Sequence, residues 1–185
     1  MKYLSFVLLL GLALAGWQVA ASGAAAAQGT PLSQRGLERI TKEVRHELLM
    51  LPYYSLFDDL EFSVQGRTVT LSGSLTSIHA ITKDQAENAV KNIEGVDKVI
   101  NNIKILSPSP LDQQARERVY RALNRMGSLS QYFWEAAPSI HIIVDHQRVT
   151  LKGFVNSEAD KNMATIAAKQ VPGIFAVDNE LRVVK

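Results

Sequence analysis

"RVTLKGFVNSE" at residues 148–158 repeats a line that the chain has already used once, "TVTLSGSLTSI" at residues 68–78. Self-similarity at a fixed spacing is the signature of a repeated structural unit. In each copy, alternating valine and leucine predict a half-buried strand, and the glycine that follows is expected at a positive φ or a close contact. The sequence therefore predicts two copies of one folding unit. The residues that return after 80 positions are Val69, Thr70, Leu71, Gly73 and Ser77, as Val149, Thr150, Leu151, Gly153 and Ser157.

The sequence around the repeated line predicts the same order of elements in each copy. Apolar residues at three- and four-residue steps predict a first helix, which ends before Pro52 in the first copy. A hairpin follows, then a second helix, a glycine that stops it, and a final strand. We expect the stopping glycines to be Gly95 and Gly173. The predicted apolar faces of the second helices are Ile78, Ile81, Ala86, Ala89, Val90 and Ile93 in the first copy, and Met163, Ile166, Ala167 and Val171 in the second.

Each copy is therefore predicted to be one αββαβ domain of the α+β class. The last two strands are joined through a helix, and such a crossover lays the third strand parallel to a neighbour in the sheet. We expect a three-stranded mixed sheet with two helices on one face. The predicted domains span residues 36–107 and 111–185, with a linker at 108–110 and a flexible stretch at 28–35 before them.

Residues 1–27 have the layout of a secretory signal peptide. One lysine precedes an apolar run that is shorter than the roughly 20 residues of a membrane span, and small residues follow. Cleavage is expected after Ala27, with Ala21 as an alternative site and an uncleaved anchor as the alternative outcome. The chain has no cysteine, so we expect neither disulfides nor a lipid-modified amino terminus. The predicted location is the bacterial periplasm.

The distribution of charge, and the positions of the histidines, serines and glycines, argue against nucleic-acid binding, metal binding, hydrolysis and phosphate binding. Residues 33–107 carry nine basic and ten acidic side chains, and residues 110–185 carry ten and eight, so neither half is basic enough for bulk nucleic-acid binding. His141 and His146 are expected on opposite faces of a hairpin, so no metal site is predicted. Ser77 and His79 lack a third member for a hydrolase triad, and the sequence has no phosphate-binding glycine loop. We expect a protein without catalytic residues, cofactor or metal.

The second copy carries a candidate lipid-binding site between its first helix and its hairpin. Arg118, Arg121 and Arg125 recur at three- and four-residue steps on one helix face, with Arg116 nearby. Aromatic residues follow at 132–134; one or two of them should be exposed, and Phe133 is the best candidate for the core. A basic helix that ends in aromatics is typical of a membrane-surface element, although a merely solvated basic face is the alternative. The predicted lipid-binding residues are Arg116, Arg118, Arg121, Arg125, Tyr132 and Trp134.

The corresponding features of the first copy are less suited to a membrane. Glutamates interleave with the basic residues of its first helix and largely cancel their charge. Its aromatic cluster, in which Phe57 is the best candidate for the core, is followed by Asp58 and Asp59, which anionic lipid would repel. We therefore expect the second copy to contact the membrane, and the first to be structural or to face a protein.

The doubled pattern resembles the BON domain of bacterial envelope proteins. "VTLSG" with "IEGVDKVINNI" carries the resemblance in the first copy, and "VTLKG" with "VPGIFAVDNEL" carries it in the second. Proteins of this family are exported and are generally thought to bind phospholipid surfaces or to attach other domains to the envelope. The resemblance implies a non-enzymatic periplasmic protein that binds anionic phospholipid and supports envelope integrity. The alternative is a protein-interaction module that docks an envelope assembly through sheet edges or the aromatic clusters. Some family members carry a lipidated cysteine, which this chain lacks.

Overall fold

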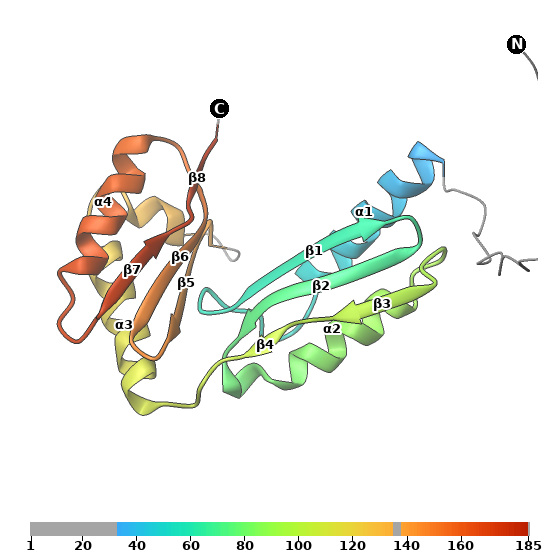
Figure 1. The fold of residues 1–185 in the computed structure, drawn as a ribbon. Coiled ribbons are helices and arrows are strands. Elements are labelled where there is room, and N and C mark those ends of the chain that lie inside the picture. The colour runs from blue at the N-terminus through green and yellow to red at the C-terminus, as the bar shows by residue number, and fades with distance from the viewer. Residues whose placement is uncertain (1–32, 135–137, 185) are drawn as a thin grey trace, which may run out of the picture. The chain divides into compact units, whose positions relative to one another are not determined.

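The computed structural model describes residues 33–134 and 138–184 (Figure 1). The predicted signal peptide lies outside the described residues, so it stays a prediction. The stretch expected to be flexible, 28–35, is already helical at its end, because the first helix begins at Gln34. Ser33 caps this helix by accepting a hydrogen bond from the backbone N–H of Gly36 at 3.2 Å.

Domain 1 is a mixed sheet with two helices. Strand β2 lies at its centre, antiparallel to β1 and parallel to β3 and β4. Since β3 and β4 follow one another along the same side of β2, they are one strand with a break, and the sheet is three strands wide. The elements are α1 (Gln34–Leu49), β1 (Asp59–Gln65), β2 (Thr68–Leu75), the 3-10 turn η1 (Ser77–His79), α2 (Ile81–Lys91), β3 (Lys98–Asn101) and β4 (Lys104–Ile105).

Domain 2 repeats this topology element by element. Strand β6 lies at the centre of its sheet, antiparallel to β5 and parallel to β7 and β8. Phe62 of β1 lies opposite Leu71, and Ile142 of β5 lies opposite Leu151, so even the register recurs after 80 residues. The elements are α3 (Pro110–Asn124), the 3-10 turn η2 (Ser130–Phe133), β5 (Ile140–Asp145), β6 (Arg148–Val155), α4 (Glu158–Lys169), β7 (Ala176–Asn179) and β8 (Arg182–Val183). The predicted α+β class and tandem αββαβ topology are confirmed.

Each domain has its own hydrophobic core between its sheet and its helices. The first core gathers Ile40 and Val44 of α1, Val69 and Leu71 of β2, and Val90 of α2, all of them fully buried. The second is built from corresponding positions of α3, β5, β6 and α4. Burial of a large apolar side chain contributes about 1.5–3 kcal/mol, so these cores can hold a fold that has no disulfides.

The predicted apolar faces of the second helices are partly wrong. Ile78 and Ile81 are 75% and 59% exposed, because η1 occupies the expected first turn and α2 starts after it. The face toward the sheet is instead Thr82, Ala86 and Val90. In α4, Ala164, Ala167 and Ala168 face the core, while Met163 and Ile166 are exposed. Small residues on the inner face let each helix lie close to its sheet.

Each hairpin has one glycine at the same position, where the backbone has a positive φ. Gly73 and Gly153 have φ values of 108° and 112°, and a Cβ at either position would overlap the carbonyl oxygen of Asp59 or Ser139. Both the positive φ and the close contact expected from the repeated line are thus present. The strands do not end there, however: β2 and β6 continue for two more residues. Gly95 and Gly173 also have positive φ, but they lie four residues beyond the helix ends, in the turn to the last strand.

An asparagine at the break of the last strand ties that strand to the second helix. The side-chain amide of Asn101 donates to the carbonyl oxygen of Lys83 at 3.1 Å, and its own oxygen accepts from the N–H of Ile103 at 3.2 Å. Asn179 makes the equivalent bonds to Lys161 and Leu181, at 2.8 and 3.0 Å. The asparagine thus satisfies backbone groups that the broken strand exposes.

No helix among the described residues is both long and apolar enough to span a bilayer.

Candidate functional site

Three of the predicted lipid-binding arginines line one groove between the helices of domain 2. Arg118, Arg121 and Arg125 project from α3, and the opposite wall is formed by α4 and the turn that follows it. The groove measures about 510 Å³, and apolar residues line it together with the arginines. All three arginines are exposed. The remaining lining residues are Ala122, Met126, Ala167, Gln170, Val171 and Pro172.

The positive charge of this groove is only partly neutralised. Arg121 pairs with Glu117 at 3.7 Å, one helical turn away. Arg118 donates to the neutral side chain of Gln114 at 3.1 Å, and neither it nor Arg125 forms an ion pair within the described chain. An exposed ion pair is worth about 0–1 kcal/mol, so Arg121 too can exchange its partner for an anion.

Arg116 does not belong to this surface, which corrects its place in the predicted set. It is 3% exposed and donates to the carbonyl oxygen of Val144 on β5 at 2.8 Å. Burial lowers the pKa of its guanidinium, and the nearby carboxylate of Asp112 acts in the opposite direction. Arg116 therefore joins α3 to the sheet and is not available to a lipid head group.

Of the two aromatic residues in the predicted lipid-binding set, one is exposed and the other is buried. Trp134 is 77% exposed, whereas Tyr132 is 6% exposed and belongs to the core. The Tyr132 hydroxyl donates to Asp160 and accepts from the N–H of Asn156, both at 2.9 Å, and burial raises its pKa. Phe133 is half-buried and meets Tyr120 edge to face at 5.4 Å. The structure thus leaves Trp134 as the exposed aromatic of the cluster, and Trp134 is not among the residues that line the arginine groove.

The acidic pair of domain 1 is buried, contrary to the expectation that it faces lipid. Asp58 is fully buried and Asp59 is 7% exposed. One oxygen of Asp58 accepts from the N–H and the hydroxyl of Thr76, at 2.7 and 2.9 Å. The other accepts from Ser55 and lies 2.6 Å from Nδ1 of His79. Repulsion by this pair is therefore no reason for domain 1 to avoid a membrane.

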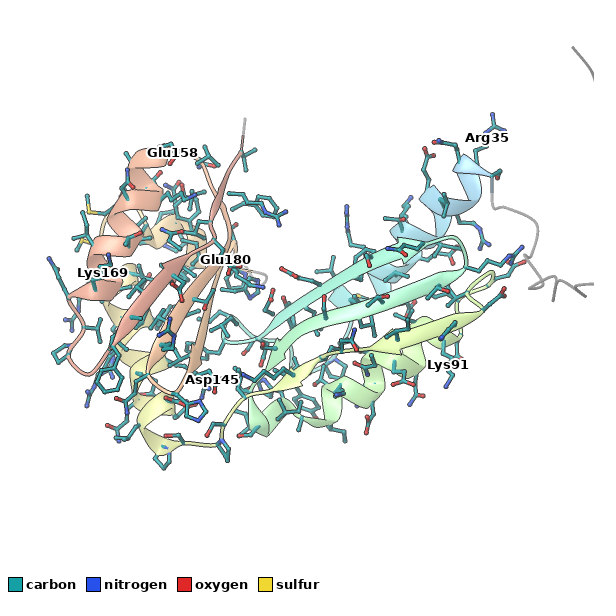
Figure 2. All side chains as sticks on the ribbon, in the orientation of Figure 1. Arg35, Lys91, Asp145, Glu158, Lys169 and Glu180 are labelled. Carbon is teal, nitrogen blue, oxygen red and sulfur yellow. The ribbon has the colours of Figure 1, made fainter. Side chains whose placement is uncertain are left out.

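The charge cancellation expected on α1 holds for Arg39. Its guanidinium pairs with Glu43 at 3.1 Å and with Glu94 at 3.5 Å. Arg35 and Lys42, in contrast, are exposed and form no ion pair with a described residue; Arg35 projects from the first turn of α1 (Figure 2). Domain 1 also has free cations in a shared groove: Lys42 and Arg45 line a smaller one, of about 340 Å³, but the acidic Glu38 lines it with them.

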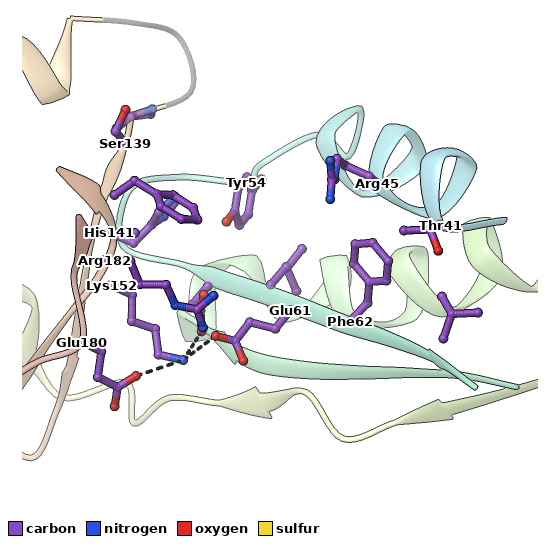
Figure 3. Close-up of a pocket in the computed structure, with 16 residues that line it drawn as sticks. Thr41, Arg45, Tyr54, Glu61, Phe62, Ser139, His141, Lys152, Glu180 and Arg182 are labelled. Carbon is purple, nitrogen blue, oxygen red and sulfur yellow. Dashed lines mark hydrogen bonds and ion pairs between the residues drawn. The ribbon is translucent and has the colours of Figure 1, made fainter. Parts of the chain in front are cut away.

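A second cavity, of about 790 Å³, runs beside β1 (Figure 3). Lys152 of β6 lies on its wall, with its ammonium group 2.7 Å from Asp59, 3.0 Å from Glu61 and 3.8 Å from Glu180. Burial alone would lower the pKa of Lys152, but hydrogen bonds to Asp59 and Glu61 raise it, so the side chain stays charged. We call this space the β1 cavity. Sequence reasoning missed it, because its residues come from segments far apart in the chain.

The family assignment rests on sequence and agrees with this architecture. A family model of the BON domain matches residues 37–107 and 111–185, and the chain belongs to the BON domain family. The predicted family and its tandem arrangement are thereby confirmed. Comparison with curated proteins found no match.

Two similar solved structures are both of CdsD, described as a structural protein of the type III secretion system of Chlamydia trachomatis. The first, its C-terminal domain, is 13% identical with a TM-score of 0.32, over 78% of this chain and 96% of that chain. The second is 17% identical with a TM-score of 0.28, over 79% of this chain and 92% of that chain.

Proposed function

We propose that this protein is a non-enzymatic, exported envelope protein that binds anionic phospholipid surfaces through domain 2 and so supports envelope integrity. The family membership supports an envelope role. The observation that carries the lipid proposal is the arginine groove: three exposed arginines on one helix face, two of them without an acidic partner among the described residues.

The expected attachment is weak and reversible. Each basic residue close to an anionic leaflet contributes about 1 kcal/mol, so Arg118, Arg121 and Arg125 together contribute roughly 3 kcal/mol. Since 1.4 kcal/mol corresponds to a factor of ten, this is about a hundredfold in binding. Salt should release the protein, because at 0.15 M the screening length is only about 8 Å. Trp134, exposed at the end of η2, could seat its ring among the head groups.

Vesicle co-sedimentation at low and at physiological salt tests the proposal. Replacing Arg118, Arg121 and Arg125 by serine should reduce binding to phosphatidylglycerol vesicles by about a hundredfold. The matched control replaces Arg35, Lys42 and Lys98, three exposed cations of domain 1, by serine and removes the same charge. If both triple variants lose binding equally, net charge alone is responsible. If neither loses binding, the groove does not bind lipid.

A further inference from the structure

The free edge of the sheet in domain 2 accepts one backbone contact from another part of the chain. The N–H of Ile142 on β5 donates to the carbonyl oxygen of Leu56 at 2.8 Å. Leu56 and Phe57 also pack against the second core. In an antiparallel ladder, N–H groups point alternately toward the partner strand and away from it. That of Ile142 points away from β6, so the turn that contains Leu56 contacts the β5 edge at this position.

The equivalent edge in domain 1 is open as far as the described residues extend. Phe62 corresponds to Ile142, and each lies opposite the equivalent leucine of the central strand. The N–H of Phe62 should therefore also point away from the central strand. Among the described residues, β1 pairs with β2 alone. Such an edge presents unpaired N–H and C=O groups that can pair with an added strand.

The β1 cavity lies directly along this open edge. Leu60, Phe62 and Val64 line it from β1, and Thr41 and Arg45 line it from α1 (Figure 3). Residues of domain 2 form the other half of the lining. A groove between an edge strand and a helix is the arrangement in which proteins bind extended peptides by strand addition. Main-chain hydrogen bonds then provide affinity, and the side-chain pockets provide specificity. Strand β1 is seven residues long, which suits a short peptide segment.

The charges of the cavity indicate the chemistry of its occupant. Lys152 is already held by Asp59, Glu61 and Glu180. Two arginines of the lining, Arg45 and Arg182, are exposed and form no ion pair with any described residue, and of the two Arg45 projects from α1 above the β1 edge (Figure 3). A polyanion would meet the three acidic side chains, whereas a peptide with apolar residues and a single acidic end meets both the apolar strand and Arg45.

We propose that the open edge of β1 binds an extended, apolar peptide segment of a partner protein by strand addition, with a carboxylate of that segment paired to Arg45. Within the chain, the turn that contains Leu56 makes one backbone hydrogen bond of this kind to the corresponding edge of domain 2. The proposed site is separate from the arginine groove and does not depend on lipid binding.

A peptide copying residues 53–59, YYSLFDD, is a suitable probe because it combines apolar residues, among them the leucine that binds the β5 edge, with a carboxylate end. It should bind the full chain saturably, protect the amide of Phe62 from hydrogen exchange and shift its NMR signal. The amides of β3, the opposite edge of the same sheet, should not respond. No change at Phe62 with millimolar peptide, or a response at β3 or β7 instead, would overturn the proposal.

Reversing the charge of residue 45, and of the peptide end that pairs with it, tests the role of Arg45. Arg45→Glu should weaken YYSLFDD at least tenfold, while Lys42→Glu, the same change at an exposed position of the same helix, should not. The peptide YYSLFKK should bind the parent weakly and regain affinity for Arg45→Glu. Equal binding of both peptides to both proteins would refute the pairing. Both substitutions are on the surface, and the amide spectrum confirms the fold. If anionic vesicles alone protect Phe62, the edge faces lipid and the peptide proposal fails.

Discussion

Replacing Asp112 by alanine should destabilise domain 2 through a turn that lies far from Asp112 in the sequence. Asp112 is 1% exposed, and its carboxylate accepts from the N–H groups of His146 and Gln147 at 2.9 and 2.8 Å. These two residues form the β5–β6 turn with φ values of 51° and 60°, which residues other than glycine rarely adopt. The carboxylate holds a turn that the residues themselves disfavour.

The expected loss can be worked out from these contacts. A hydrogen bond to a charged group contributes about 1.5–3 kcal/mol, and Asp112 accepts two, although water can partly replace them at the exposed turn. The substitution also removes the carboxylate that favours the buried charge of Arg116. Asp112→Ala should therefore cost about 3–5 kcal/mol. For a chain of this size, each kcal/mol lowers Tm by about 2–4 °C, so Tm should fall by roughly 10 °C.

Amide hydrogen exchange of β5 and β6 measures the opening free energy of domain 2 itself. Asp112→Asn keeps one acceptor and should lose about half as much. Glu117→Ala, at an exposed position of the same helix, is the control and should change stability by less than about 0.5 kcal/mol. Placing Asn-Gly at positions 146 and 147 should recover part of the loss, because that pair favours two positive φ values. Equal stability of Asp112→Ala and Glu117→Ala would show that the carboxylate does not hold the turn.

Three further predictions concern other parts of the molecule. Gly153→Ala should cost about 3 kcal/mol or more, because its Cβ would overlap a carbonyl oxygen, whereas Gly66→Ala, with a positive φ but open space, should cost about 1–2 kcal/mol; urea unfolding compares them. Burial lowers the pKa of His141, so below about pH 6.5 the unfolded chain takes up a proton that the native protein does not. Stability should therefore fall as the pH drops from 7 to 5, and His141→Gln should flatten that slope; an unchanged slope would contradict the assignment. In a chain lacking residues 1–27, Trp134 is the only tryptophan, and its emission should start at long wavelength and shift to shorter wavelength with anionic vesicles. An emission that vesicles leave unmoved would count against its insertion.

The repeat and the order of elements could be predicted because they depend on local patterns. Alternating residues fix which face of a strand is buried, and Gly73 and Gly153 mark a backbone position that other residues cannot occupy. The same reasoning failed at Ile78 and Ile81, since a single 3-10 turn moved the start of α2 and with it the buried face. Periodicity locates a helix more reliably than it locates the first residue of that helix.

The candidate site was only half predictable, because spacing along a helix does not show what packs against it. Arg118, Arg121 and Arg125 share a face as expected. Arg116, only two residues before Arg118, points to the sheet and binds a backbone carbonyl. The buried Tyr132 donates its hydroxyl to Asp160, which is 28 residues away. Such pairings arise from the tertiary fold, and one sequence gives no signal for them.

The polar contacts at the ends of the two hairpins differ between the domains, so a segment of one domain cannot replace the equivalent segment of the other without losing these contacts. The N–H groups of Thr76 and Asn156 are equivalent, 80 residues apart, yet the first is bound by Asp58 and the second by Tyr132. In domain 1 the carboxylate precedes the hairpin, whereas in domain 2 the carboxylate, Asp160, follows it. A hybrid that joined the front of domain 1 to the back of domain 2 would bring two carboxylates together, and the reverse hybrid would have none. Similar domains in one chain are prone to exchange segments as they fold. The different placement of the carboxylate in each copy should therefore disfavour the exchange of segments between the two domains during folding.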